Sequence, residues 1–359
     1  MSEVGPTTKL DLTATGAIVE PAGEPALDLA EHPTDRERIL EIRDLRVTFP
    51  TESGDVQAVR GVDVTVHQSE LLGVVGESGS GKSVTFLAAM GLLPKTARIE
   101  GSVKIRGQEL IGEKKKALQR SRGKRIAMIF QDPLSALNPT HKVGSQVSEM
   151  VRSHQDMSKE RARQRAVELL DMVGIPQPAT RARQYPHEFS GGMRQRVMIA
   201  MAIANDPEVL IADEPTTALD VTVQAQILEV IRRIQHELGT AVVFITHDLG
   251  VVARIADRVQ VMYAGRAVER AEVRDLFTRA THPYTKGLLA SLPTLGRGRL
   301  TPIPGAPPNM LNPPSGCAFR ARCAHAEDRC ALGLPELEPF GDLETACIRA
   351  GELALARSA

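Results

Sequence analysis

The chain has 359 residues, of which 42% are hydrophobic and 25% charged, as in an ordinary globular protein of one or two domains. Its 44 Lys and Arg residues balance 44 Asp and Glu residues, which argues against a global field that would attract nucleic acid or anionic lipid. Aromatic residues make up 3%, Trp is absent, and no apolar run approaches the roughly 20 residues of a membrane-spanning helix.

Residues 1–38 are rich in Ala, Gly, Pro, Thr and acids and show no sustained periodicity, which predicts a disordered N-terminal tail. They contain no basic stretch followed by an apolar segment, so we expect no secretory signal and a cytoplasmic chain. Folded structure is expected from Ile39, where ILEIRDLRVTF alternates as a strand does.

Strand and helix patterns alternate along the rest of the chain. Further apolar runs of strand length lie at residues 71–75 and 125–130, and EVLIADEP (208–215) and AVVFITHD (241–248) are two more that end in polar residues. Helical patterns cover 83–93 and 159–173, and the second is followed by Gly174, a common helix stop. This alternation predicts an α/β fold with a mostly parallel sheet, which binds ligands at the carboxyl ends of its strands.

The segment 76–83 is the first functional motif and fits G-x-x-x-x-G-K-[ST] throughout. It consists of Gly76, Glu77, Ser78, Gly79, Ser80, Gly81, Lys82 and Ser83. Glycines let backbone amides curl around a phosphate, and the following helix N-terminus adds positive potential. We expect Lys82 to reach the β- and γ-phosphates of ATP and the Ser83 hydroxyl to ligate Mg²⁺. The alternative is a glycine-rich turn that matches by chance, but the flanking strand and helix favour the phosphate loop.

Asp213 and Glu214 follow four apolar residues at the end of a predicted strand. A buried strand would hold Asp213 near the metal, through water, and place Glu214 where it can polarise the attacking water. Two solvated acids at a strand end are the alternative for this pair alone. The phosphate loop upstream favours the catalytic interpretation.

A third motif, Ser190-Gly191-Gly192, lies at a predicted helix start, which can bind an anion. Taken alone, it is more simply a helix cap. Together with the motifs on either side, it resembles the L-S-G-G-Q signature of ABC ATPases, with Phe189 in place of the leucine and Met193 in place of the glutamine. One chain needs only one phosphate loop, so a second anion site is explained if it faces the ATP of a partner chain.

The resemblance to the ABC nucleotide-binding domain covers about residues 39–290 and implies roles for further residues. It makes Gln131, in FQDP, the Q-loop glutamine that contacts Mg²⁺ and links the core to the helical subdomain. It makes Ala218-Leu219-Asp220 the D-loop, in which Asp220 crosses the dimer interface, and His247 the switch histidine that contacts the γ-phosphate. Phe49 would stack on adenine, the alternative being a strand core residue.

Within this superfamily the chain is similar to the ATP-binding subunits of peptide/nickel (oligopeptide/dipeptide) importers. The similar segments are GESGSGKS, FQDPLSALNP, FSGGMRQRVMIAMAIA, HPYTKGLLASLP and, most distinctively, IPGAPPNMLNPPSGCAFRARC. The resemblance implies a P-loop NTPase fold with a RecA-like core and a helical subdomain over residues 39–293. A proline-rich linker and a small C-terminal extension would follow over 294–359.

The same resemblance implies an ATP-hydrolysing energy-coupling subunit at the cytoplasmic face of the cell membrane. Its partners would be two integral permeases, a sibling ATPase or a second copy, and, indirectly, an extracytoplasmic substrate-binding protein. A peptide is the expected cargo, and nickel or another small solute is the alternative, because permeases and binding protein choose the cargo. A soluble ABC ATPase acting on DNA or ribosomes is a third hypothesis, disfavoured by the single cassette, the absence of sustained heptads and the balanced charge.

All four cysteines lie near the C-terminus and are separated by 5, 6 and 16 residues: Cys317, Cys323, Cys330 and Cys347. In a reducing compartment such a group favours metal binding or reactive thiols over disulfides. In related peptide-importer subunits such a set can hold an iron–sulfur cluster, and four thiolates are what a [4Fe–4S] cluster needs. Structural zinc, whose ligands usually lie in closer pairs, and four unliganded thiols are the alternatives.

Overall fold

The computed structural model describes residues 36–217, 219–292 and 302–355. Most of the predicted tail and the first part of the predicted linker lie outside these ranges. The domain boundaries expected at residues 38/39 and 293/294 stay predictions.

An antiparallel sheet comes first along the chain. Its strands, in spatial order, are β2 (Gly54–His67), β1 (Arg38–Thr51), β4 (Arg98–Ile105) and β5 (Gln108–Glu109). The alternation predicted from Ile39 is confirmed, since Leu40, Ile42 and Val47 are fully buried in β1. Ile42 lies opposite Val64 of β2, so the two strands cover one apolar face.

The second sheet carries the predicted buried strands. Its order is β11 (Glu338–Phe340), β12 (Leu343–Thr345), β10 (Arg266–Glu272), β9 (Arg258–Tyr263), β3 (Leu71–Val75), β8 (Ala241–Thr246), β7 (Val209–Asp213) and β6 (Ile126–Ile129). The strands from β9 to β6 are parallel, whereas β10, β11 and β12 add antiparallel pairs. The prediction of a mostly parallel sheet was therefore wrong for the molecule as a whole, because short hairpins join β1 to β2 and β9 to β10.

Every residue of β3, β7 and β8 is buried, as expected for strands covered on both faces. Leu71 and Val75 of β3 pack into one apolar cluster, and Leu72 and Val74 pack into another on the opposite face. The core thus has two layers separated by the parallel strands. These rigid strands end in the loops that carry the predicted site residues.

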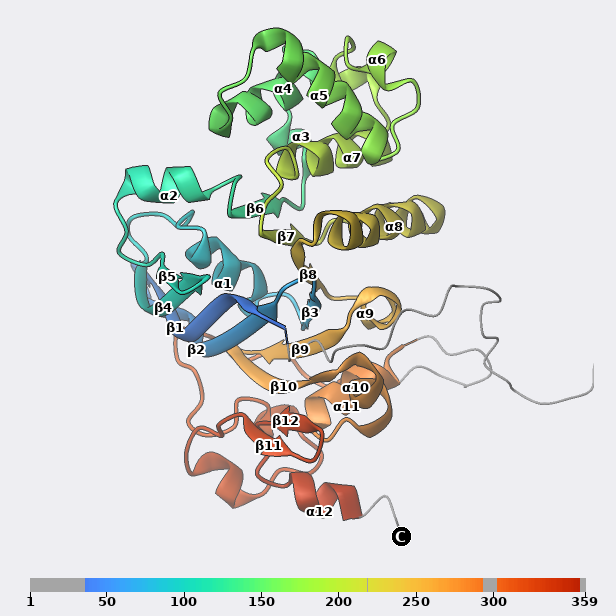
Figure 1. Ribbon diagram of the computed structural model, residues 1–359. Helices are drawn as coiled ribbons and strands as arrows, with labels where there is room; N and C mark the ends of the chain where they lie inside the picture. The colour runs from blue at the N-terminus through green and yellow to red at the C-terminus, as the bar shows by residue number, and fades with distance from the viewer. Residues whose placement is uncertain (1–35, 218, 293–301, 356–359) are drawn as a thin grey trace, which may run out of the picture. The chain divides into compact units, whose positions relative to one another are not determined.

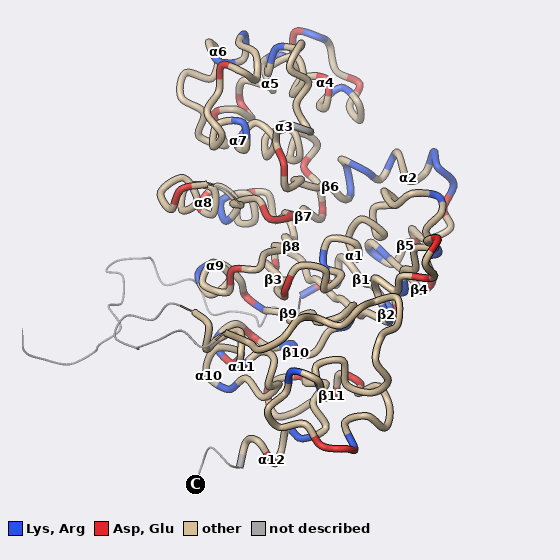
Figure 2. The backbone as a smooth tube through the Cα atoms, turned by 180° about the vertical axis from the view of Figure 1, so that it is seen from behind, with Lys and Arg blue, Asp and Glu red and all other residues tan. Residues whose placement is uncertain are grey.

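Helices fill the connections between the parallel strands. They are α1 (Lys82–Ala89), α2 (Lys115–Ser121), α8 (Val221–Leu238) and α9 (Leu249–Ile255). The helix expected over 83–93 is shorter than predicted, because Gly91 takes a left-handed φ of 62° just beyond its end. Around α2, Figure 2 shows a local concentration of Lys and Arg, while acidic and basic residues are interspersed along most of the remaining chain.

A group of helices forms the helical subdomain that the resemblance implied (Figure 1). They are α3 (Pro133–Ala136), α4 (Val143–His154), α5 (Lys159–Met172), α6 (Pro178–Arg181) and α7 (Gly191–Ala202). The predicted helix over 159–173 is confirmed as α5, and its apolar face is buried at Ala162, Ala166, Leu169 and Leu170. It ends before Gly174, which has a φ of 76°.

The C-terminal residues pack onto the second sheet. They follow α10 (Val273–Arg279) and α11 (Pro283–Ala290) and end in α12 (Ala350–Leu355). Thr345 of β12 lies opposite Glu269 of β10, and Leu343 and Phe319 are buried in the same cluster as the helices and strands of the core. The segment is therefore in direct contact with the ATPase core. None of the described helices combines the length and apolarity needed to cross a membrane.

Candidate functional site

The phosphate loop runs from the end of β3 into α1. Gly76 and Gly81 have φ values of 153° and 95°. A Cβ at Gly76 would lie 2.2 Å from the carbonyl oxygen of Met262, and one at Gly81 would lie 2.6 Å from that of Ala58. Only glycine therefore fits at these two positions. The loop is held close to β2 and β9.

Lys82 folds back over the phosphate loop. Its Nζ donates hydrogen bonds to the carbonyl oxygens of Gly76 at 2.7 Å and Glu77 at 3.0 Å. The side chain is buried, and burial lowers the pKa of Lys82 although Glu214, Asp213 and Glu77 oppose this shift. The ammonium is thus desolvated and partnered by neutral carbonyls, a position from which it can contact phosphate oxygens.

Ser83 and Asp213 meet across the site. The Ser83 hydroxyl donates to Asp213 Oδ1 at 2.8 Å, joining the first turn of α1 to the end of β7. Burial raises the pKa of Asp213, against the lowering effect of the Ser83 hydrogen bond. A hydroxyl and a carboxylate are oxygen donors of the kind that Mg²⁺ takes in nucleotide sites, so this pair fits the metal expected there.

Glu214 is the centre of a polar cluster beside this pair. Its Oε2 accepts from Gln131 Nε2 at 3.0 Å and from Thr217 Oγ1 at 2.9 Å, and its Oε1 lies 3.1 Å from His247 Nδ1. Burial alone would raise the pKa of Glu214, but the hydrogen bonds from His247 and Thr217 outweigh it and leave the pKa below its ordinary value. The carboxylate is therefore ionised at neutral pH.

Three of the predicted residues, Glu214, Gln131 and His247, thus come together although they lie far apart in the chain. Their roles in hydrolysis stay predictions. Thr217 was missed, and its only signal was a hydroxyl three residues after Glu214. His247 follows β8, and its side chain is 61% exposed, which leaves it accessible to a ligand.

The Ser190-Gly191-Gly192 motif begins α7. Ser190 is the N-cap, and its side chain accepts from the Met193 amide at 3.3 Å. Gly192 lies against α8, where a Cβ would come within 2.5 Å of Val223. Across the described part of the chain, no hydrogen bond joins this motif to the phosphate loop. The motif is an exposed helix start in a chain whose phosphate loop lies elsewhere.

Asp220 and Phe49 lie outside the cluster around the phosphate loop in the contacts that the structure gives for them. Asp220 is exposed and caps α8, accepting from the amides of Thr222 and Val223 at 3.0 Å each. Ala218 of the predicted D-loop lies outside the described residues. Phe49 is half-buried on β1. Adenine stacking by Phe49 and the interface role of Asp220 stay predictions.

Two contacts to the phosphate loop come from residues that sequence reasoning did not single out. The Glu77 amide donates to Tyr284 Oη at 2.9 Å. Arg322 donates from Nη1 to Glu77 Oε2 at 2.7 Å and from Nη2 to Oε1 at 2.9 Å. Both residues lie inside the segments HPYTKGLLASLP and CAFRARC. Nothing in those segments indicates that they reach a loop more than 200 residues earlier.

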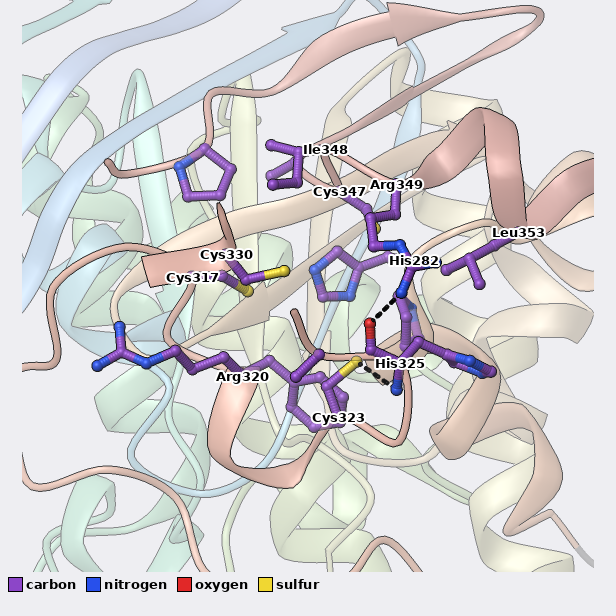
Figure 3. Close-up of a pocket in the computed structure, with 15 residues that line it drawn as sticks. His282, Cys317, Arg320, Cys323, His325, Cys330, Cys347, Ile348, Arg349 and Leu353 are labelled. Carbon is purple, nitrogen blue, oxygen red and sulfur yellow. Dashed lines mark hydrogen bonds between the residues drawn. The ribbon is translucent and has the colours of Figure 1, made fainter. Parts of the chain in front are cut away.

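The four cysteines line one pocket with His282 and His325 (Figure 3). All four are free thiols, and the Sγ of Cys323 accepts from the His325 amide at 3.4 Å. Burial raises the pKa values of Cys317, Cys323 and Cys347, the last to about 11.

This pocket was the expected metal site. In the residues that the structure describes, no group of three or more His, Cys, Asp or Glu side chains is arranged to hold a metal ion. The arrangement of these side chains therefore gives no support to the expected iron–sulfur cluster or to zinc.

The chain matches two protein-family models. Residues 59–217 match the ABC transporter family, and residues 268–330 match the C-terminal region of oligopeptide/dipeptide transporters. The first match contains the phosphate loop, Gln131, the Ser190 motif and the acidic pair. The second contains Tyr284, Arg322 and three of the four cysteines.

Similar proteins carry related names. The chain is 55% identical over 294 residues to the oligopeptide transport ATP-binding protein OppD of Bacillus subtilis, covering 80% of this chain and 82% of that protein. It is 54% identical over 326 residues to OppD of Mycobacterium bovis, covering 89% of this chain but only 53% of that longer protein.

Among solved structures, the dimeric ATP-binding cassette MJ0796 with bound ADP and Pi has a TM-score of 0.59 and 28% identity, over 66% of this chain and 99% of that one. The likeness covers a complete cassette. Together with the family matches and the joined phosphate loop and acidic strand end, it shows that this chain belongs to the ATP-hydrolysing subunits of the ABC transporter family, with the C-terminal region typical of oligopeptide/dipeptide transporters.

Proposed function

We propose that this chain is the energy-coupling ATPase of a peptide importer and works at the cytoplasmic face of the cell membrane. The observation that carries the proposal is the presence, in one chain, of an ABC cassette and the oligopeptide/dipeptide transporter C-terminal region. The names of relatives that are more than 50% identical support the same cargo class. Two integral permeases and an extracytoplasmic binding protein would complete the importer.

Each residue of the site has a proposed task in ATP hydrolysis. The phosphate loop amides and Lys82 bind the phosphates, and Ser83 and Asp213 hold Mg²⁺, which would neutralise phosphate charge when bound. Glu214, ionised at neutral pH, accepts a proton from the attacking water. Gln131 and His247 orient this carboxylate from two sides and exchange these hydrogen bonds for contacts with the nucleotide.

The exposed Ser190 motif has a proposed task in a dimer. A helix start with unpaired amides binds an anion, so this motif would contact the ATP held by the phosphate loop of a partner ATPase. ATP bound between the two chains favours the closed dimer, and loss of the γ-phosphate removes that preference. The partner is a sibling ATPase or a second copy of this chain.

Uptake by cells tests the proposed cargo. A strain that lacks the chain is complemented with wild type, with Glu214→Gln, or with Glu229→Gln, a matched change at a carboxylate that is 74% exposed on α8. Wild type and Glu229→Gln should restore uptake of a labelled oligopeptide, and Glu214→Gln should not. If wild type restores uptake of labelled nickel but not of the peptide, nickel and not a peptide is the cargo. A chain that copurifies with no permease would overturn the transporter proposal.

A further inference from the structure

An ion pair joins the C-terminal segment, residues 302–355, to the phosphate loop. The Arg322 side chain is only 6% exposed, and it pairs with both carboxylate oxygens of Glu77, which is 26% exposed. Two parallel charge-assisted hydrogen bonds in a largely buried position fix both distance and orientation. A lysine could not reproduce this planar, two-point contact.

Arg322 is itself held in place by a backbone carbonyl and by two aromatic rings, one of which belongs to β9. Its Nε donates to the carbonyl of Pro304 at 2.8 Å, and its guanidinium carbon lies 5.8 Å and 5.9 Å from the ring centres of Tyr263 and Phe319. Phe319 packs edge-on against Tyr263, with ring centres 5.4 Å apart, and is equally close to Tyr284. The guanidinium is therefore preorganised before any nucleotide arrives.

Glu77, the residue that Arg322 holds, is fixed at three points. Its side chain pairs with Arg322, its amide donates to Tyr284, and its carbonyl accepts from Lys82 Nζ at 3.0 Å. A shift of Glu77 would therefore move the Lys82 ammonium and the loop amides together. The position of a residue in the C-terminal segment thus sets the geometry of the phosphate loop.

The ion pair also has an electrostatic consequence. Glu77 puts a carboxylate in a loop that must accept a polyanion, and two like charges held in a partly buried site repel each other. Arg322 is the cation that neutralises this carboxylate. Without it, the loop would bind ATP beside an unpaired negative charge.

We propose that Arg322 is a positioning residue for ATP binding: it neutralises Glu77 and holds the phosphate loop in its nucleotide-binding shape. The inference rests on the assignment of residues 76–83 as the ATP phosphate site. It also gives the C-terminal segment a task in the ATPase cycle. Cys323, the next residue, lines the thiol pocket in Figure 3, so the chemical state of that pocket lies one residue from a determinant of ATP affinity.

The test measures ATP dissociation constants and steady-state hydrolysis in the full-length chain. The variants are Arg322→Gln, Glu77→Gln, the double variant, Arg322→Lys, and the control Arg329→Gln, which removes an arginine that is 47% exposed in the same segment. Arg322→Gln should weaken ATP binding about tenfold. It should raise KM more than it lowers kcat, because the lost contact stabilises bound nucleotide before and during reaction alike.

Neutralisation of Glu77 by Arg322 predicts a difference between the variants that general damage to the fold would not produce. Glu77→Gln loses the ion pair but leaves no unpaired charge, so it should lose less affinity for ATP than Arg322→Gln, and adding it to Arg322→Gln should recover part of the lost affinity. Arg322→Lys should fall between wild type and Arg322→Gln, and Arg329→Gln should match wild type. A loss in Arg322→Gln that Glu77→Gln does not rescue would overturn the proposal.

Lys82→Ala distinguishes a failure of the phosphate-loop assignment from a failure of the proposed role of Arg322. If Lys82→Ala loses ATP binding while Arg322→Gln binds like wild type, the phosphate loop assignment stands and the role of Arg322 is wrong. If Lys82→Ala binds ATP like wild type, the loop itself is not the phosphate site and the proposal falls with it. Neither result depends on whether the transported cargo is a peptide.

Discussion

Glu214 is the residue where local geometry and proposed chemistry meet most directly. It directly follows β7 with a left-handed φ of 46°, a conformation that costs a non-glycine residue about 1–3 kcal/mol. The Glu214 amide donates to the Ile245 carbonyl of β8, and the carboxylate has hydrogen-bond partners in Gln131, Thr217 and His247. The surrounding contacts thus hold a strained residue with its carboxylate in a fixed position.

Replacing this carboxylate separates binding from hydrolysis. Glu214→Gln keeps the phosphate loop, Lys82 and the Ser83–Asp213 contact, so ATP should bind about as in wild type. Hydrolysis should slow by about 10²–10⁴-fold, because the amide cannot accept a proton from water. Nucleotide binding and phosphate release, measured on the same sample, check both expectations, and Glu229→Gln is the matched control. Turnover at the wild-type rate in Glu214→Gln would remove Glu214 from the catalytic role.

At the residue scale, the sequence predicted those parts of the site that are encoded by short motifs. Gly76–Ser83 and the Asp213–Glu214 pair each have a local pattern with a physical reason. Arg322 and Tyr284 could not be found in this way, because they reach Glu77 across 245 and 207 residues. A long-range ion pair has no periodicity or spacing that marks its two ends.

Among the elements, α11 has an unusual N-terminus. His282 is its N-cap, and the unprotonated Nδ1 accepts from the Tyr284 amide at 3.1 Å. The residue is 2% exposed, and its amide donates to the buried carboxylate of Glu269 at 3.0 Å. Burial, together with the nearby Lys286, lowers the pKa of His282 from 6.5 to about 3. Protonation would also replace the capping acceptor with a donor.

This cap predicts a pH dependence of stability. Below the unfolded pKa of 6.5 the unfolded chain binds a proton at His282 that the folded chain does not bind until about pH 3. Stability should therefore fall on acidification within this window, and His282 should contribute about 1.4 kcal/mol per pH unit. In His282→Asn, whose side-chain oxygen can still cap the helix, this contribution should vanish.

Urea unfolding at a series of pH values from 6.5 downward measures how steeply the free energy of unfolding changes with pH in wild type and in His282→Asn. The control is His236→Asn, which changes an exposed histidine on α8 and should keep the wild-type slope. Equal slopes in wild type and His282→Asn would mean that the folded chain takes up this proton after all. A variant that is destabilised equally at every pH would show a capping role without the predicted titration.

At the element scale, the predictions of strands and helices were confirmed where the sequence has a clear hydrophobic pattern. The strands β3, β7 and β8 and the helix α5 were found because burial on both faces of a strand, or on one face of a helix, leaves a clear apolar pattern. The antiparallel additions β10, β11 and β12 were missed. β11 and β12 are three residues long, and their partner β10 contains charged residues such as Glu269 and Arg270, so no apolar run marks this edge.

For the whole molecule, the exposed Ser190 motif raises the question of a composite ATP site. Within the described residues of a single chain, this motif makes no hydrogen bond to the phosphate loop. If two copies pair head to tail, each ATP is held by the loop of one chain and the Ser190 motif of the other. Such an interface has two equivalent sites related by a twofold axis.

Mixing two inactive variants tests this arrangement. Lys82→Ala lacks the phosphate-binding ammonium, and Ser190→Arg blocks the helix start with a bulky side chain, so each alone should hydrolyse ATP poorly. A mixed dimer combines the intact loop of the Ser190→Arg chain with the intact motif of the Lys82→Ala chain. An equal mixture should recover roughly a quarter of wild-type activity, because half of randomly paired dimers are mixed and each has one complete site of two.

The control for this mixture is Ser153→Arg, the same substitution at an exposed serine of α4, which should hydrolyse ATP like wild type. Mixing Lys82→Ala with Lys82→Ala/Ser190→Arg should give no recovery, because neither chain supplies a working loop. If the first mixture also stays inactive while wild-type chains hydrolyse ATP alone, two copies do not complete each other's sites. The Ser190 motif would then have to serve a sibling ATPase, and adding that sibling to the Lys82→Ala chain should restore hydrolysis at the sibling's own phosphate loop.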